Sequence, residues 1–206
     1  MVNKFQYLIS LDPSFTRTGI CVIDLKNKHI YFHTVSCKIG EKQFENVVHA
    51  AQSIVNQLKE IFNTYGDNYK LIHEAPLPCS SMSSALYSLD TLIYNTFENH
   101  ILTTYNPATL RSRIHCRKYD KNDSLQLAEK YLKILSEKGY ITHIEIPRVR
   151  KLPHDCAESF LYSHLWLKEN NYSDFQFDNS EEIKLFKLRQ KELKRREKLL
   201  SSNKEI

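Results

Sequence analysis

Residues 8–24 read LISLDPSFTRTGICVID, and this stretch decides the fold. Its first half is a continuous apolar run that ends at Asp12, as in a buried strand at the centre of a sheet. Its second half contains another apolar run, from Thr18 to Asp24, and a third run follows from Ile30 to Ser36. Residues 26–28 have the composition of a tight turn. Runs spaced in this way predict antiparallel strands joined by hairpins.

Beyond Gly40 the spacing of apolar residues changes from that of strands to that of helices. Apolar side chains recur at steps of three and four, which indicates amphipathic helices that alternate with short strands. The predicted helices span residues 47–62, 80–97, 124–138 and 154–168, and the predicted strands span residues 69–73, 101–105 and 140–146. Residues 110–123 are basic and predicted to be irregular. Three antiparallel strands followed by this alternation predict an α/β fold, with a mixed sheet and helices on both faces.

The composition is that of a globular protein. Of 206 residues, 41% are hydrophobic and 26% are charged, which excludes a mostly disordered chain. No apolar run is long enough to span a membrane, and the run before Asp12 is too short for a signal peptide. Five scattered cysteines without a CxxC pair indicate reduced thiols in a cytoplasm, and no glycine-rich phosphate loop occurs. The net charge of +5 permits a polyanionic partner.

Four carboxylates occur where a site would form. Asp12 and Glu74 each end an apolar strand, and Asp155 and Glu158 lie three residues apart at the start of the last predicted helix. Converging carboxylates repel one another, and a hard divalent cation such as Mg²⁺ relieves that repulsion. Two such ions would stabilise both the attacking and the leaving oxygen of phosphodiester cleavage. Each residue also has a structural interpretation, in a turn, on the surface or as a helix cap.

Two segments concentrate positive charge. The first holds the candidate DNA-binding residues, which are Arg111, Arg113, Arg117, Lys118 and Lys121. Basic side chains mixed with aromatic ones suit phosphate contacts and base stacking. The second segment, residues 184–198, has eight Lys and Arg against two Glu and has helical composition. A solvated loop and a solvated helix are the structural alternatives for these two segments.

Together the motifs resemble those of the RuvC-type Holliday junction resolvases, and the resemblance covers roughly residues 5–170. The stretch at residues 8–24 resembles the family's strand that ends in Asp-Pro-Gly and runs into a Thr-Gly hairpin. KLIHEAP at residues 70–76 resembles the family's second motif, and LPHDCAESFLYSHLWL at residues 152–167 resembles its last. NPATLRSRIHCRKYDKNDSLQLAEKYL at residues 106–132 resembles its basic segment. Each motif is short, so specificity comes from their order and spacing.

The resemblance implies an RNase H-like fold with a mixed five-stranded sheet, a homodimer, and paired nicks made with divalent metal near a four-way junction. It implies that the catalytic metal ligands are Asp12, Glu74, Asp155 and Glu158. Lys121 matches the family's lysine that approaches the DNA backbone, and Arg111 or Arg113 matches its other basic contact. The chain departs from the family at Ser14, where glycine is usual, and at Glu158, where aspartate is usual. This divergence suggests a phage or mobile-element relative.

The predicted function is a metal-dependent endonuclease that resolves Holliday junctions and other branched DNA, with two Mg²⁺ ions per site that Mn²⁺ can replace. The predicted nuclease domain spans residues 1–170, and residues 171–206 are predicted to form a polar loop and a basic helical tail. We expect it in the cytoplasm of a bacterial or phage-infected cell. Two alternatives stay open: a non-catalytic protein that binds branched DNA, and a nuclease of the same fold with another substrate such as RNA. ATPases of the actin and sugar-kinase type share the opening motif but need two such domains, for which 206 residues are too few.

Overall fold

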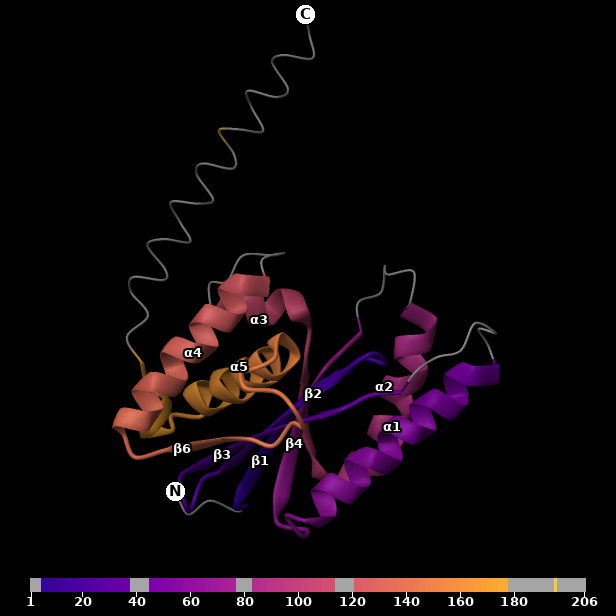
Figure 1. Cartoon of the computed structure of the whole chain (residues 1–206), viewed down its shortest axis with the longest axis horizontal. Coiled ribbons are helices and arrows are strands. Elements are labelled where there is room, and N and C mark those ends of the chain that lie inside the picture. Colours follow the sequence, from indigo (N-terminus) through magenta and orange to yellow (C-terminus); the bar gives the residue numbers. More distant parts are fainter. Residues whose placement is uncertain (1–4, 38–44, 77–82, 114–120, 178–194, 196–206) are drawn as a thin grey trace, which may run out of the picture.

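A mixed six-stranded sheet forms the centre of the molecule (Figure 1). The structure is a computed structural model and describes residues 5–37, 45–76, 83–113, 121–177 and 195. The strands are β1 (Tyr7–Asp12), β2 (Thr18–Asp24), β3 (His29–Val35), β4 (Tyr69–Glu74), β5 (Ile101–Tyr105) and β6 (Ile141–Ile144). The helices are α1 (Glu45–Asn63), α2 (Ser83–Phe97), α3 (Pro107–Arg113), α4 (Lys121–Glu137) and α5 (His154–Glu169), with short 3₁₀ turns η1 (Glu98–His100) and η2 (Ser173–Phe175).

The strand order is β5-β4-β1-β2-β3-β6. β1, β2 and β3 pair antiparallel, as the apolar runs at the start of the chain predict. β4 and β5 extend the sheet parallel to β1 on one side, and β6 pairs parallel with β3 on the other. The predicted fold class is confirmed, but the expected number of five strands is wrong because β6 adds a sixth. Two amides hold that edge at 2.9 Å, from Ile141 N to the Lys28 carbonyl and from Glu145 N to the Phe32 carbonyl.

Helices cover both faces of this sheet, because its side chains alternate between two apolar faces. Leu8, Cys21 and Phe32 belong to the core on the side of α4 and α5, whereas Ile9 and Ile20 belong to the core beside α1 and α2. Figure 1 shows α1 and α2 on one side of the sheet and α3, α4 and α5 on the other. Eleven of the 16 residues of α5 are buried, and the helix packs across β1, β2 and β4. Its position relative to the strand ends is therefore fixed.

The segment after β5 is more regular than the sequence analysis expects. Of residues 110–123, the first four lie in α3 and the last three lie in α4, so the prediction of an irregular stretch is wrong there. The Asn106 side chain accepts a hydrogen bond from the backbone N two residues on, and Pro107 opens the helix. Asn as cap followed by Pro favours a helix start, and Leu110 is buried against the core. Residues 114–120 lie outside the described residues.

The residues that follow α5 pack against the core. Phe175 and Phe177 are buried, and both rings lie close to the ring of His164. The beginning of the predicted polar loop therefore adds to the apolar core. Residues 184–198, the basic segment, lie outside the described residues apart from Arg195. Within the described part of the chain, no helix combines the length and the apolar character that a membrane crossing requires.

Candidate metal centre

Asp12 and Glu74 lie on the α5 face of the sheet, at the carboxyl ends of two neighbouring strands. Asp12 has the same parity along β1 as Ser10, whose hydroxyl donates to the Ser159 carbonyl of α5 at 2.6 Å. Glu74 has the same parity along β4 as Ile72, which belongs to the core beneath α5. β1 and β4 run parallel and in register up to these two residues. Strand pairing therefore places the two carboxylates side by side.

A glycine lets the first turn of α5 lie directly on the sheet. Gly19 pairs with Asp12 across the ladder between β1 and β2. A β-carbon at Gly19 would lie 2.2 Å from the carbonyl carbon and oxygen of Asp155 and 2.6 Å from the Cys156 backbone N. Only glycine fits here without displacing the helix. The Thr-Gly pair of the hairpin thus brings the start of α5 next to Asp12.

Glu158, one turn into α5, completes an acidic cluster with the two strand ends. One carboxylate oxygen from each of Asp12, Glu74 and Glu158 lies within 4.8 Å of the other two. Glu158 is buried, and the other two are half-buried. Carboxylates at this separation repel one another unless a cation lies among them, and three oxygen donors fit Mg²⁺ or Mn²⁺. The structure therefore brings together three of the four predicted ligands in a donor set that suits the predicted metal.

Asp155, the fourth predicted ligand, lies at the rim of this cluster in an ion pair. Arg17 Nε donates to Asp155 Oδ2, and His154 Nδ1 is 3.6 Å from Asp155 Oδ1. Burial alone would raise the pKa of Asp155, but the contacts with His154 and Arg17 outweigh burial and lower that pKa. Asp155 is thus an anion whose charge is balanced by protein groups. Its role as a metal ligand stays a prediction.

His154 connects Asp155 to the acidic cluster. Its Nε2 lies 3.4 Å from Glu158 Oε1, one helical turn on. The contacts with Asp155 and Glu158 raise the pKa of His154 to about 9, although burial opposes the change. The imidazolium is therefore charged at neutral pH and offsets part of the repulsion among the carboxylates. Neither His154 nor Arg17 is among the predicted site residues, although the four-residue spacing from His154 to Glu158 is visible in the sequence.

Two hydroxyl groups hold carboxylates of the cluster. Tyr162 OH donates to Glu74 Oε2, and Ser124 Oγ donates to Glu158 Oε1 at 3.3 Å. Burial, with the charge of Glu74, holds the pKa of Tyr162 well above its ordinary value, so the phenol keeps its proton and remains a donor. Tyr162 lies one turn after Glu158 on the same face of α5. Neither hydroxyl is predictable from the sequence, because contacts between separate elements leave no local pattern.

Of the five predicted DNA-binding residues, Arg113 is the one whose side chain the structure describes. It forms an ion pair with Glu169 at the end of α5, and Tyr105 OH donates to the same carboxylate at 2.9 Å. Glu169 lies eleven residues beyond Glu158, which is about 16 Å along the helix. The Arg113 charge is thus held well away from the acidic cluster. Arg111 and Lys121 belong to α3 and α4, and Arg117 and Lys118 lie outside the described residues.

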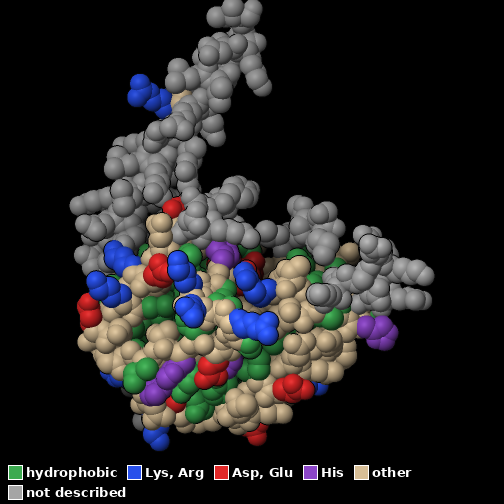
Figure 2. Space-filling model, in the orientation of Figure 1, with side chains coloured by type: hydrophobic (Ala, Val, Ile, Leu, Met, Phe, Trp, Pro, Cys, Tyr) green, Lys and Arg blue, Asp and Glu red, His purple; other side chains and the backbone are tan. Residues whose placement is uncertain are grey.

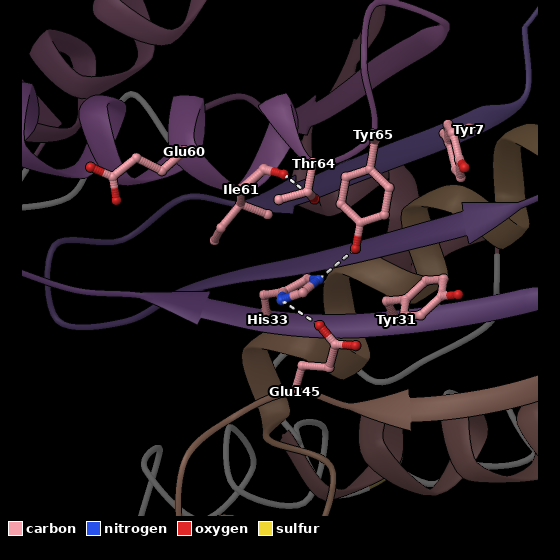
Figure 3. Close-up of a pocket in the computed structure, with 8 residues that line it drawn as sticks. All are labelled: Tyr7, Tyr31, His33, Glu60, Ile61, Thr64, Tyr65 and Glu145. Carbon is pink, nitrogen blue, oxygen red and sulfur yellow. Dashed lines mark hydrogen bonds and ion pairs between the residues drawn. The ribbon is translucent and has the colours of Figure 1, made fainter.

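A polar hollow lies on the opposite face of the sheet, beside α1 (Figure 3). Its volume is about 590 Å³, and its lining is Tyr7, Tyr31, His33, Glu60, Ile61, Thr64, Tyr65 and Glu145. His33 Nε2 is 2.8 Å from Tyr65 OH, and His33 Nδ1 is 3.6 Å from Glu145 Oε2. Burial lowers the pKa of His33 against the effect of Glu145, so the ring is neutral at neutral pH. His33, Tyr65 and Glu145 thus pair with one another, unlike the three converging carboxylates of the acidic cluster.

Comparison with solved structures agrees with the observed topology. The structure of RuvC from Thermus thermophilus matches with a TM-score of 0.54 at 14% identity, over 80% of this chain and 96% of that chain. RuvC from T. thermophilus in complex with Holliday junction substrate matches with a TM-score of 0.53 at 11% identity, over the same shares of the two chains. This is an RNase H-like fold.

A weaker likeness is to the large terminase nuclease from thermophilic phage G20c. Its TM-score is 0.40 at 13% identity, over 78% of this chain and 82% of that chain. No protein-family model and no curated protein sequence matches the chain. At such identities the two RuvC structures show a shared fold, and function has to be inferred from the site itself.

Proposed function

We propose that this protein is a divalent-metal-dependent nuclease. The observation that carries the proposal is the cluster of Asp12, Glu74 and Glu158, whose oxygens converge from two strand ends and one helix. Bringing three carboxylates together costs free energy through repulsion and through loss of solvation. A bound cation offsets that cost and provides a centre for chemistry. Asp155, one turn before Glu158, is proposed as the fourth ligand.

The protein groups around the cluster have separate roles in this proposal. Bound Mg²⁺, proposed as two ions and replaceable by Mn²⁺, would provide a nucleophilic water and neutralise charge on the scissile phosphate. The hydroxyls of Tyr162 and Ser124 orient two of the ligating carboxylates. Arg17 and His154 place positive charge at the rim, where a negatively charged phosphate must approach. In-line attack by water leaves a 5′-phosphate and a 3′-hydroxyl end.

Branched DNA, with the four-way junction foremost, is the proposed substrate. Support comes from the motifs at residues 8–24, 70–76 and 152–167, and from the fold shared with a RuvC that was solved with a Holliday junction substrate. Paired nicks on a symmetric junction need two sites related by a two-fold axis, so we propose a homodimer. α2 offers a surface for pairing, because Tyr87 and Tyr94, two turns apart, are 42% and 51% exposed.

The proposed nuclease domain extends past residue 170, where the sequence analysis ends it, to Phe177. The buried rings of Phe175 and Phe177 support that boundary. Residues 184–198 are proposed to add contacts with the DNA backbone through their excess of positive charge, as are the basic residues between positions 111 and 121. A cytoplasmic location, in a bacterial or phage-infected cell, completes the proposal.

One set of incubations tests the proposal. The full chain is mixed with four-way junctions, Y-forks, linear duplex and RNA–DNA hybrid, with and without Mg²⁺. We expect cleavage only with metal, strongest on junctions, and a light-scattering mass about twice 24.3 kDa. Preference for forks or hybrid would keep the nuclease and change its substrate. Binding without cleavage would indicate a non-catalytic DNA-binding protein, and the nuclease proposal would then fail.

A further inference from the structure

Three exposed cations precede the acidic cluster in the connection between β6 and α5. We call residues 147–151 the basic turn; it carries Arg148, Arg150 and Lys151, all of them exposed. None of the three side chains makes a hydrogen bond or an ion pair within the described part of the chain. Figure 2 shows Lys and Arg side chains gathered on this face of the molecule, over α4 and the segment that enters α5. Unpaired charge at this place is available to a ligand.

The backbone of the basic turn has an unusual conformation. Val149 N donates to the Ile146 carbonyl at 3.2 Å, with Pro147 at the second position and Arg148 at the third. Arg148 has a φ of +62°, in the left-handed region. Proline followed by a positive φ is the pattern of a type II turn, whose third position favours glycine or asparagine. A non-glycine residue at this position strains the backbone, so the presence of arginine has to be explained by what its side chain does.

The basic turn is anchored directly to the candidate metal centre. Leu152 and Pro153, which follow it, are buried, and the Pro153 carbonyl accepts a hydrogen bond from Ala157 N of α5 at 2.9 Å. Lys151 therefore lies only four residues before Asp155 and seven before Glu158. The same helix start that carries Asp155 and Glu158 also fixes the end of the basic turn, so the exposed cations directly precede the helix that contributes to the site.

We propose that Arg148, Arg150 and Lys151 bind the phosphodiester backbone of the nucleic acid strand that enters the metal centre. The inference rests on the proposed nuclease function and adds a substrate contact to it. The carboxylates of the cluster repel a phosphate backbone, and three unpaired cations beside them offset that repulsion. Contacts of this kind position a strand without reading its sequence. The basic turn therefore determines where along the strand a phosphate reaches the carboxylates, not which bases flank it.

Binding at several salt concentrations tests this inference. The full chain carrying Asp12→Asn, which cannot cut in the proposed mechanism, is titrated onto labelled four-way junction, duplex and RNA–DNA hybrid in Mg²⁺. Arg150→Gln with Lys151→Gln is compared with Lys26→Gln with Lys59→Gln, which removes two exposed cations from the far end of the β2–β3 hairpin and from α1. Each lost phosphate contact lowers the slope of log affinity against log salt by about 0.9 on duplex DNA.

We expect the basic-turn pair to lower that slope by about 1 to 2 and to weaken binding roughly tenfold or more, with no change for the control pair. Arg148→Gly separates this effect from misfolding, because glycine suits a φ of +62°. We expect this variant to lose affinity while its Tm stays equal or rises. An unchanged slope in both basic-turn variants, or an equal change in the control pair, overturns the inference.

The two proposals fail in distinguishable ways. Cleavage of a nucleic acid by the wild-type chain with Mg²⁺, together with unchanged binding by the basic-turn variants, refutes only the inference. Loss of binding in those variants, together with no cleavage by the wild-type chain, refutes the nuclease and leaves the basic turn as a nucleic-acid contact. The nucleic acid for which these variants lose most affinity, DNA or RNA–DNA hybrid, is the one that the basic turn binds.

Discussion

The two faces of the sheet differ in how their polar side chains are arranged: like charges converge on one face, and polar groups pair on the other. On the face of α5, Asp12, Glu74 and Glu158 bring three negative charges within 4.8 Å of one another. On the face of α1, His33 in the hollow pairs with both Tyr65 and Glu145. Like charges held together need a ligand to offset their repulsion, whereas paired groups do not. Convergence of like charges, and not the presence of a hollow, therefore identifies the site.

One tyrosine on each face shows the same difference between the acidic cluster and the hollow. Tyr162 donates its hydroxyl to Glu74 in the cluster, and Tyr65 pairs with His33 in the hollow. Burial is the largest cause that raises the pKa of each phenol, so both stay neutral at ordinary pH. They provide matched positions at which the same substitution should have different consequences.

The largest effect is expected from removal of one charge of the cluster. Asp12→Asn should lower the rate of Mg²⁺-dependent cleavage by roughly three orders of magnitude or more, since it removes a ligand of the metal that stabilises the transition state. Affinity for DNA should be retained or improved because a repelling charge is lost. Glu145→Gln in the hollow is the control and should cut like the wild-type chain. A near-normal rate for Asp12→Asn would contradict the assignment of the cluster.

Gly19→Ala should affect both the fold and the site. The new β-carbon would meet the backbone of Asp155, so α5 must move, at a cost of roughly 1–3 kcal/mol in the free energy of unfolding. Displacement of Glu158 by about 1 Å should slow cleavage by roughly a hundredfold. Gly66→Ala is the control: its φ is +64° with no atom nearby, so it should lose about 1 kcal/mol and keep its cleavage rate. Urea unfolding and cleavage assays on both variants separate the two outcomes.

Tyr162→Phe should raise the Mg²⁺ concentration for half-maximal cleavage by about 10- to 100-fold, because a carboxylate that has lost its hydrogen bond binds metal less well. Tyr65→Phe removes the same oxygen from the hollow and should leave the Mg²⁺ dependence unchanged. Metal titrations of the cleavage rate compare the two variants. Equal curves for both would mean that the bond from Tyr162 to Glu74 has only a structural role.

An effect on stability alone is expected in mild acid. Burial, with the charges of Lys168 and Lys138, lowers the pKa of His164 to about 3, whereas in the unfolded chain it is about 6.5. Between these values the unfolded chain binds the extra proton, so the free energy of unfolding should fall as pH drops, by up to ~1.4 kcal/mol per pH unit. His164→Phe should flatten the pH dependence between pH 6.5 and 4.5. The exposed His49, changed to Gln, should leave it unchanged, and a parallel decline in all three proteins would refute the prediction.

Sequence alone predicts the parts of the site that lie at the ends of apolar strands. Asp12 and Glu74 follow buried runs, and parallel neighbours in a sheet end at the same edge, so their proximity follows from topology. Asp155 and Glu158 share a helix face by spacing, but spacing does not tell which of them reaches the strand ends. Asp155 instead pairs with Arg17, a contact between residues 138 positions apart that no local pattern records.

The start of α3, the sixth strand and the basic turn differ in how far the sequence predicts them. The start of α3 is signalled by Asn106 and Pro107, a cap followed by a favoured first helical residue. The sixth strand, β6, is predicted as a strand, but only the pairing with β3 shows that it joins the sheet. The basic turn is not apparent, because its geometry depends on a positive φ at Arg148, where a sequence pattern would require glycine.

The central claim, that Asp12, Glu74 and Glu158 hold divalent metal, is tested most directly by calorimetric titration of Mn²⁺ without nucleic acid. The wild-type protein is compared with Glu158→Gln and Glu145→Gln. Each variant loses one carboxylate, and the two lost carboxylates lie on opposite faces of the sheet. We expect Glu158→Gln to bind Mn²⁺ at least about tenfold more weakly, since a ligating charge is lost, and Glu145→Gln to bind like the wild-type protein. Equal affinity in all three, or equal losses in both variants, would contradict the account.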